Sequence, residues 1–275
     1  MKGKRRVPRR STANERGAAD TRREAAIIEA VTPGWERLRP RTLVDHAVEA
    51  IVAGAARGLI LPGDRIVEAE IARALGISRV PVREALRLLE SQGLVVNEAY
   101  KGIRLVSFTQ ERLKQALEVR VALEITAARR LIGARRGSGR ANGPNRRIKL
   151  PAELVGHVEA MEVMAARGDA YGVASTDAAF HRELCRLSGN EVLAAMWEQL
   201  ARQFTIIAGL ATFGKSMTDV VEEHRALLSV LASGDMVRIE RELEDHIQTQ
   251  NEMIDYEQVI EERRRARRAA QAQVA

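Results

Sequence analysis

Apolar residues recur along most of this chain at the three- and four-residue spacing of amphipathic helices. In the N-terminal third, this spacing predicts helices over 43–57, 68–75 and 79–92. Residues 59–64, Leu-Ile-Leu-Pro-Gly-Asp, indicate a short strand that runs into a turn, and 94–106 indicate a β-hairpin with a Gly-containing tip. Three helices followed by a hairpin predict a winged helix.

The second and third predicted helices form a helix-turn-helix pattern. Gly76 ends the first of them where a left-handed residue is expected, and Ser78 can cap the helix that follows. Arg79, Arg83 and Arg87 then repeat every four residues on the side opposite the apolar stripe. Such a pair presents a recognition helix to a DNA groove. The alternative is two packed helices with an ordinary solvated arginine face, but the flanking helix and hairpin favour a DNA reader.

From Thr109 onward the pattern is almost purely helical. Helices are expected near 110–134, 151–167, 170–187, 190–211, 217–232 and 235–262. Short links between long amphipathic helices predict an antiparallel bundle. The one long break, 133–144, is rich in Gly, Arg and Asn and predicts a flexible basic loop. The expected fold class is therefore mainly α: an N-terminal winged helix-turn-helix with a small β-hairpin wing, and a C-terminal all-α antiparallel helical bundle.

Length and charge divide the chain further. Its 275 residues can hold two domains. We expect a basic, mostly disordered arm at 1–40, a winged helix at 41–108, an all-helical domain at 109–262 and a basic tail at 263–275. The net charge of +7 is uneven: +6 falls in the arm and +8 in 129–149, whereas the winged helix holds nine basic against eight acidic residues. Its affinity for DNA must therefore come from the placement of its arginines, while the arm either adds phosphate contacts or is a solvated tail.

Composition narrows the location of the protein. Aromatic residues make up 3% of the chain, which favours helices packed on small residues. No run approaches the roughly 20 apolar residues of a membrane span, and the basic N-terminus lacks the apolar core of a signal peptide. The lone cysteine, Cys185, excludes an intramolecular disulfide and fits a reducing compartment. We therefore expect a cytoplasmic, nucleoid-associated protein without a membrane partner.

Three histidines fall on separate helices of the predicted bundle: His181, His224 and His246. Asp177 precedes His181 by four residues, so the two side chains share one face of one helix. One carboxylate with three imidazoles suits a borderline divalent metal such as zinc, nickel, iron or manganese. From the residues alone, scattered surface or core histidines are the simpler interpretation.

The N-terminal motifs are dense. They are Leu59-x-x-Pro62-Gly63, Leu75-Gly76-Ile77-Ser78-Arg79-Val80-Pro81-Val82-Arg83-Glu84-Ala85-Leu86 and Leu89-Glu90-x-x-Gly93-Leu94-Val95. With these motifs, residues 41–106 closely resemble the DNA-binding domain of the GntR family of bacterial transcription regulators. The resemblance implies that Ser78, Arg79 and Arg83 contact double-stranded DNA from the recognition helix, and that Lys101 and Gly102 contact it from the wing.

Residues 109–262 resemble the FCD effector domain that follows many GntR winged helices. The matching residues are Asp177-Ala178-Ala179-Phe180-His181, Ser188-Gly189-Asn190, Glu223-His224 and His246. The resemblance implies that Asp177, His181, His224 and His246 bind one divalent metal, and that this metal helps to hold a small organic acid. Arg120 lies where the family places a basic residue that faces the pocket, so it could pair with the carboxylate of the acid.

Simpler interpretations stand beside these assignments. Arg120 could instead be an exposed helix residue that pairs with Glu124, four positions on. Cys185 lies one turn beyond the predicted ligands on the same helix, and it either borders the pocket or is a small apolar core residue. His46 and His157 match no motif and are interpreted as ordinary surface residues.

Together these observations indicate a ligand-responsive transcriptional regulator, expected to be a repressor and not an enzyme. Two subunits would form a homodimer, place their recognition helices in successive major grooves of a pseudo-palindromic operator, and respond to a small carboxylate in a metal-containing pocket. Two competing functions are a metal-dependent enzyme with a DNA-binding appendage and a non-specific architectural DNA-binding protein dominated by its basic arms. The sequence has no HExxH motif and no Gly-rich phosphate loop, which favours the regulator over the enzyme.

Overall fold

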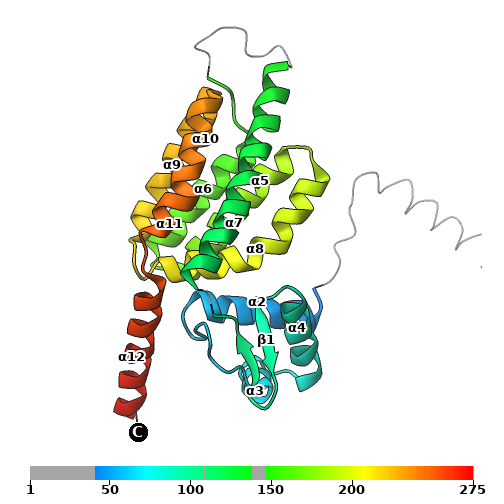
Figure 1. Ribbon diagram of the computed structural model, residues 1–275, viewed down its shortest axis with the longest axis vertical. Helices are drawn as coiled ribbons and strands as arrows, with labels where there is room; N and C mark the ends of the chain where they lie inside the picture. The colour runs from blue at the N-terminus through cyan, green and yellow to red at the C-terminus, as the bar shows by residue number, and fades with distance from the viewer. Residues whose placement is uncertain (1–40, 108, 138–146, 275) are drawn as a thin grey trace, which may run out of the picture. The chain divides into compact units, whose positions relative to one another are not determined.

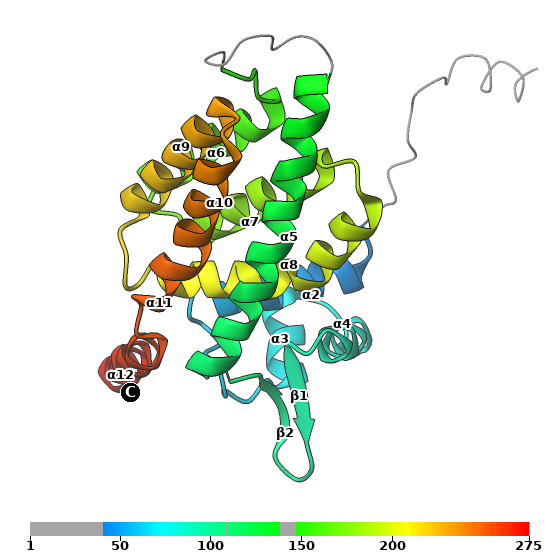
Figure 2. The ribbon, with the colours of Figure 1, turned by 45° about the horizontal axis from the view of Figure 1, so that its top comes forward.

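A computed structural model describes residues 41–107, 109–137 and 147–274 of the chain. The elements of a winged helix come first (Figure 1): α2 (Leu43–Ala56), α3 (Glu68–Leu75), α4 (Arg79–Ser91), β1 (Val95–Glu98) and β2 (Gly102–Leu105). The two strands are antiparallel, with Val95 opposite Leu105 and Glu98 opposite Gly102. Figure 2 shows that this hairpin projects beyond the neighbouring helices, as a wing does.

Local signals set the ends of these helices. Thr42 and Asp45 form a capping box at the start of α2, in which each side chain accepts the backbone N–H of the other residue. Gly76 follows α3 in the left-handed conformation, with φ 66°. Ser78 takes the N-cap position of α4, although its side chain makes no capping hydrogen bond. The predicted helix-turn-helix is therefore present.

The short strand predicted at 59–64 is wrong. This segment forms turns, and an isolated bridge joins the following Arg65 to β2. Gly63 has a φ of 83°, which ends an extended backbone, and the Asp64 carboxylate closes the turn by accepting the N–H of Leu61 at 3.0 Å. Leu61 is fully buried. The apolar residues of this run are therefore those of a partly buried loop, and they do not indicate an extended strand.

The rest of the described chain is helical, as predicted. Its first six helices are α5 (Gln110–Gly137), α6 (Ala152–Ala166), α7 (Ala170–Leu187), α8 (Glu191–Ala211), α9 (Met217–Ser233) and α10 (Met236–Glu244). Gly189 and Gly234 follow α7 and α9 in the left-handed conformation, and the side chains of Asn190 and Asp235 cap the next helices. The fold is mainly α, a winged helix joined to a helical bundle, which confirms the predicted class.

Two predicted basic segments fall largely outside the described residues. The loop expected from residue 133 begins later, because α5 continues to Gly137. Residues 138–146 of that loop and the arm 1–40 are not among the described residues. Within the described ranges, every helix is too short or too polar to cross a membrane.

The single helix predicted at 235–262 is wrong as well. After α10 come a π-helical turn, η1 (Asp245–Thr249), and α11 (Gln250–Glu252), and a break precedes α12 (Tyr256–Val274). Asp255 accepts the N–H of Gln258 at 2.9 Å and so caps α12 as a new helix. A π-turn holds more residues per turn than an α-helix, so it shifts the faces of the residues that follow it. Residue 262, where the helical domain was expected to end, lies inside α12.

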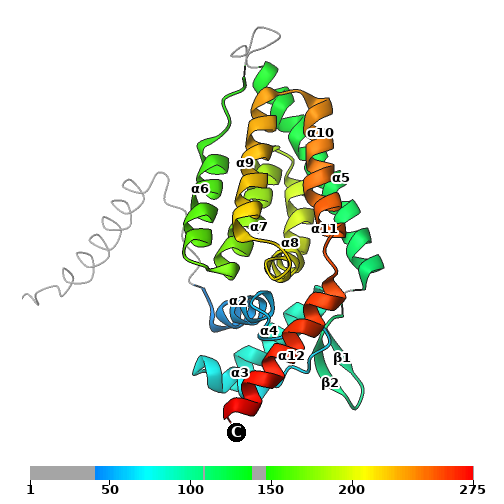
Figure 3. The ribbon, with the colours of Figure 1, turned by 90° about the vertical axis from the view of Figure 1, so that its left-hand side faces the viewer.

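Two helices of the C-terminal part hold the winged helix. On α8, a Cβ added to Gly209 would lie only 2.5 Å from the Ala56 Cβ at the end of α2. On α12, Arg264 donates to the carbonyl oxygen of Pro62 at 2.5 Å, and Arg267 donates to the Asp64 carboxylate at 2.6 Å. Figures 1 and 3 both show α12 running beside the winged helix. The main apolar core accordingly extends from the winged helix through α8 into the bundle.

Candidate functional site

Four side chains with metal-ligating atoms meet inside the bundle. Asp177 and His181 lie one turn apart on α7, His224 lies on α9, and His246 lies on η1. All four are buried, and within the described ranges their donor atoms form a single group whose members lie within 4.8 Å of one another. The Nε2 atoms of His181 and His246 are 3.2 Å apart, and the Nε2 atom of His224 is 3.1 Å from Asp177 Oδ1. The structure thus brings together the four residues that the family resemblance singles out.

The second nitrogen of two rings fixes their orientation. The Nδ1 of His181 lies 2.5 Å from the Glu124 carboxylate, and the Nδ1 of His224 lies 2.8 Å from the carbonyl oxygen of Val220. Each Nδ1 must carry a proton to donate to its oxygen, so each Nε2 turns a lone pair toward the cluster. Both atoms of the 3.1 Å contact between His224 and Asp177 are then acceptors. A cation between them would relieve this unfavourable contact.

The ionisation states also fit a divalent transition metal. Burial and then the charge of Arg120 lower the pKa of His181, and burial and then the neighbouring His224 lower the pKa of His246 well below its ordinary value. Burial raises the pKa of Asp177, but the polar and charged groups around it, Arg120 among them, outweigh burial and lower that pKa. At neutral pH His181 and His246 therefore offer neutral imidazoles and Asp177 an ionised carboxylate, as metal ligands must. Donors of one ion at about 2.1 Å lie up to about 4.2 Å apart, so small side-chain shifts complete the fit.

Unpaired polar atoms are concentrated at this site. Six buried side-chain atoms of the described residues have no hydrogen-bond partner, and four belong here: Asp177 Oδ2, His224 Nε2, His246 Nδ1 and Arg120 Nη2. Buried polar atoms are nearly always paired in folded proteins. We therefore interpret these four atoms as partners for an ion or a ligand.

Glu124 of α5 organises the inner side of the cluster. It is fully buried and accepts hydrogen bonds from His181 at 2.5 Å, Arg120 at 2.8 Å and Trp197 at 3.1 Å. Burial alone would raise its pKa, but His181 and Arg120 outweigh burial and lower the pKa to about 2. Sequence reasoning considered Glu124 only as the partner in a surface pair and did not identify Trp197. The four-residue spacing of Arg120 and Glu124 looks the same for an exposed pair as for a buried one.

Arg120 forms the pair with Glu124 that its sequence position allowed, but it is buried and is not the exposed helix residue of the simpler interpretation. It is 4% exposed, and its Nε donates to Glu124. Its unpaired Nη2 lies 3.9 Å from Asp177 Oδ2, and its guanidinium lies 4.9 Å from the ring centre of Phe204. Arg120 therefore pairs with Glu124 and still turns one donor-bearing nitrogen toward the metal-ligand cluster.

A small cavity adjoins the cluster. It is lined by Arg120, by three of the four potential ligands, and by four further polar residues: Lys215, Glu223, Gln250 and Asn251. Residues of α7 and α8, among them Ile207 and Ala208, form apolar walls. The volume of about 40 Å³ is enough for ordered water molecules or for the polar groups of a small ligand. Apart from Glu223, which belongs to the FCD motif, these polar residues were not singled out, because they follow no metal or phosphate spacing.

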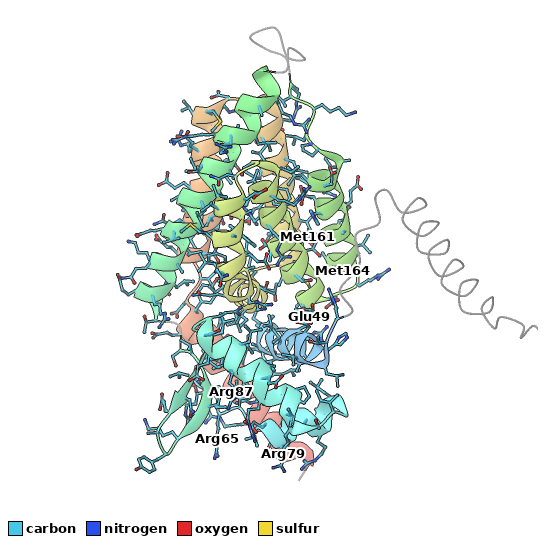
Figure 4. All side chains as sticks on the ribbon, turned by 90° about the vertical axis from the view of Figure 1, so that its right-hand side faces the viewer. Glu49, Arg65, Arg79, Arg87, Met161 and Met164 are labelled. Atoms are coloured by element: carbon cyan, nitrogen blue, oxygen red, sulfur yellow. The ribbon has the colours of Figure 1, made fainter. Side chains whose placement is uncertain are left out.

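The recognition helix α4 exposes arginines at its surface. Arg79 and Arg87 are exposed, as Figure 4 shows, and so is Ser78 at the start of the helix. Arg83 is held differently, because its Nε and Nη2 donate to the Glu68 carboxylate of α3 at 3.1 and 3.0 Å. Ser78 and Arg79 are thus accessible to DNA in this structure. Arg83 would reach DNA with its remaining N–H groups or after leaving Glu68.

The wing carries the other two DNA-contact positions. Lys101 pairs with Glu98 at 3.0 Å and keeps 67% of its side chain exposed, and Gly102 has a φ of 81°. Beside them, Tyr100 is fully exposed and has a φ of 65°, which is uncommon for a residue other than glycine. Arg65 lies next to Gly102, and Figure 4 shows it at the same end of the winged helix as Arg79. Sequence reasoning missed Tyr100, although an aromatic residue in a polar turn was a signal for it.

The remaining candidates lie outside the cluster. Cys185 is fully buried in the apolar core, and burial raises the pKa of its thiol. This placement fits its interpretation as a small core residue. His46 is exposed on α2, and His157 is half-buried on α6. Neither histidine belongs to the group of potential ligands.

Two family models match the chain. Residues 43–105 match the model "Bacterial regulatory proteins, gntR family", and residues 115–249 match the model "FCD domain". The chain is also similar to the "Probable D-xylose utilization operon transcriptional repressor" of Paenarthrobacter nicotinovorans. The two are 31% identical over 212 residues, which cover 77% of this chain and 88% of that protein.

Two solved structures have a similar fold. One is E. coli McbR/YncC, with a TM-score of 0.60 and 20% sequence identity, and the match covers 76% of this chain and 95% of the other. The second is a putative transcriptional regulator GntR from Rhodococcus sp. RHA1, with a TM-score of 0.58, 18% identity and the same two coverages. At these identities the likeness concerns the fold, a winged helix joined to a helical bundle.

Proposed function

The chain belongs to the gntR family of bacterial regulatory proteins and is a transcriptional regulator with an FCD domain, and on this premise we propose how it acts. It binds a pseudo-palindromic operator as a homodimer and represses transcription. Its DNA affinity changes when a small carboxylate binds beside a divalent metal in the bundle. The observation that carries the sensing step is the buried cluster of four potential ligands that opens on a cavity.

DNA binding rests on the placement of a few side chains. The winged helix is nearly neutral by its residue counts, so bulk charge gives it little attraction to DNA. Exposed Ser78 and Arg79 stand at the start of α4, the end of a recognition helix that contacts base edges, and Lys101 and Gly102 stand on the wing. A symmetric pair of such domains reads two half-sites, so the proposal includes a homodimer. The relative from Paenarthrobacter is named as a repressor, which supports the proposed sign of regulation.

Sensing rests on the cluster and on Arg120. Asp177, His181, His224 and His246 would hold the metal, and a bound divalent ion would supply a Lewis-acidic contact for a carboxylate. Glu124 keeps the His181 ring turned toward the cluster through the contact at its Nδ1. Arg120 keeps one unpaired nitrogen at the cavity, where it can donate to the carboxylate of a bound acid. The ligand can change DNA affinity only as far as it binds two arrangements of the protein unequally.

The test of this proposal uses metal-stripped protein, zinc as the probe, and DNA from the region upstream of the gene. Calorimetry should show one zinc site per chain in the unaltered protein and in the exposed-histidine control His46→Gln, and none in His224→Gln. Gel shifts should show binding of the upstream fragment over random DNA, and a change of affinity when zinc and small carboxylic acids are added together.

Three results would count against parts of the proposal. Equal zinc binding by His224→Gln and the control would remove the metal site. Equal binding of upstream and random DNA would point to an architectural DNA-binding protein. A DNA affinity that no carboxylate changes would leave a regulator without the proposed sensing step.

A further inference from the structure

A second cationic side chain, that of Lys215, lines the cavity that Arg120 also lines. The Lys215 ammonium contacts the Glu223 carboxylate in a close ion pair and donates to the side-chain oxygen of Gln250 at 3.3 Å. All three residues line the cavity. The side chains of Lys215 and Glu223 are only 16% and 24% exposed, so water screens this pair less than a surface pair. The cavity is therefore lined by two cationic side chains, those of Arg120 and Lys215.

Glu223 links that second cation to the metal-ligand cluster. Its Oε1 contacts Lys215, and its Oε2 lies 3.9 Å from the unpaired Nδ1 of His246. An incoming anion that binds Lys215 would have to share its ammonium group with Glu223. The Glu223 carboxylate thus already occupies the place that a second carboxylate of a ligand would need.

The charges around the cavity favour a ligand with a single negative charge. The cationic groups are Arg120 and Lys215, and the carboxylates are those of Asp177, Glu223 and Glu124, the last in contact with Arg120. These two cations and three carboxylates have one negative charge in excess, and a divalent ion changes this to one positive charge in excess. Poorly hydrated charges are costly unless they are paired. Binding of one carboxylate then brings the total charge to zero, whereas a second carboxylate would again leave one negative charge in excess.

The hydrogen-bonding groups of Lys215 and Glu223 favour a hydroxylated ligand. An ammonium group has three protons to donate, and Lys215 uses two of them for Glu223 and Gln250. The third proton is available for a hydrogen bond to an oxygen of a ligand in the cavity, and the Glu223 carboxylate can accept a hydrogen bond from a hydroxyl group of that ligand. A purely aliphatic tail would gain neither hydrogen bond and would desolvate both charged groups.

We propose that the cavity takes a small hydroxylated monocarboxylate, and that Glu223 excludes dicarboxylates. The carboxylate of the ligand contacts Arg120, and a hydroxyl group of the ligand contacts Lys215 and Glu223. This inference rests on the proposed sensing function, because it concerns the ligand of the metal-loaded site. It assigns to Glu223 and Lys215 the choice between classes of acid.

The experiment measures binding of three acids to zinc-loaded protein by calorimetry and by the shift in melting temperature. The acids are glycerate, propionate, which lacks the hydroxyl groups, and malate, which has a second carboxylate. Unaltered protein should bind glycerate at least about tenfold more tightly than either of the others. In Glu223→Gln the preference should move toward malate by about tenfold, because the variant removes one negative charge. Glu222→Gln, the exposed neighbour on α9, is the matched control and should keep the original preference.

The outcomes separate this inference from the proposed function. If unaltered protein binds malate as tightly as glycerate, or if Glu223→Gln keeps the original order, Glu223 does not select the charge. If propionate equals glycerate, the hydroxyl group is not recognised, and Lys215→Met should then leave glycerate binding unchanged. If none of the acids nor any other carboxylate binds, the proposed sensing function itself fails. Zinc binding and melting of each variant confirm that it is folded and loaded.

Discussion

Gly209 is the point at which α8 touches the backbone of the winged helix, and one added methyl group tests that contact. A Cβ at this position would lie 2.5 Å from the Cβ of Ala56, 2.6 Å from its carbonyl oxygen and 2.7 Å from its Cα. Carbon atoms in contact are normally about 3.5–4.0 Å apart. The Gly209→Ala variant must therefore separate α2 from α8 by about 1 Å, because two of the opposing atoms are main-chain atoms that cannot rotate away.

Two effects set the size of the change in stability. Overpacking of a close contact costs about 1–3 kcal/mol. Alanine in place of glycine in a helix returns up to about 1 kcal/mol. The matched control is Gly133→Ala on α5, where a new Cβ would meet no atom within 4 Å, so only the favourable helix effect remains. The same methyl group should thus stabilise one variant and destabilise the other, with a difference of about 1–3 kcal/mol.

Thermal and urea unfolding of the two variants check this prediction. For a chain of this size, 1 kcal/mol changes the melting temperature by about 2–4 °C, so Gly209→Ala should melt at least about 2 °C below Gly133→Ala. Circular dichroism before melting shows whether both variants are folded. If Gly209→Ala is as stable as Gly133→Ala, α2 does not rest on the α8 backbone in the way described here.

Three other predictions concern the metal-ligand cluster, the DNA contact and the ion pair between α12 and Asp64. Glu124→Gln should weaken zinc binding by about 10–100-fold in calorimetry, because it weakens the hydrogen-bond acceptor at His181 Nδ1. The control, Glu118→Gln at an exposed position of α5, should leave zinc binding unchanged. Equal zinc affinities of the two variants would contradict the role of Glu124. Arg79→Ala should cost about 1–3 kcal/mol of operator binding in gel shifts, and an unchanged ratio of operator to random binding would remove it as a base contact. The pKa of Asp64 is lowered, because its hydrogen bonds with Arg267 and the N–H of Leu61 outweigh burial, so its stabilising contribution is complete above the ordinary aspartate pKa and is lost as the pH falls below it. Urea unfolding should therefore find Asp64→Asn about 1 kcal/mol less stable at pH 7, with a difference that shrinks as the pH falls below the ordinary aspartate pKa, and a pH-independent difference would refute this assignment.

The winged helix could be predicted almost completely, because its signals are local. The apolar stripe of α4, the left-handed Gly76 and the N-cap position of Ser78 each depend on a few neighbouring residues. The failed strand at 59–64 shows the limit of this reasoning. Leu61 is apolar because the core of the folded chain covers it, and burial does not specify an extended backbone.

The site could be predicted only as far as its ligands. The spacing of Asp177 and His181 is visible within one helix, but their approach to His246 depends on the π-turn of η1, which interrupts a helical pattern without changing its composition. The roles of Glu124 and Lys215 depend on partners from other elements. Charged residues are usually solvated, so the sequence favours surface positions for both, and only the packing of the bundle shows that they face the cluster and its cavity.

The contacts of the cavity walls connect the cavity to the winged helix through two helices, α8 and α12. Ile207 and Ala208 form part of one wall, and the next residue of α8, Gly209, touches the winged helix. Asn251 forms part of another wall and accepts the Tyr256 hydroxyl at 2.7 Å, at the start of the helix whose arginines hold Pro62 and Asp64. A ligand acts on an equilibrium only through unequal affinity for its two states. In this chain α8 and α12 are two elements that can carry such a difference, because both helices lead from a cavity wall to the DNA-binding domain through direct contacts.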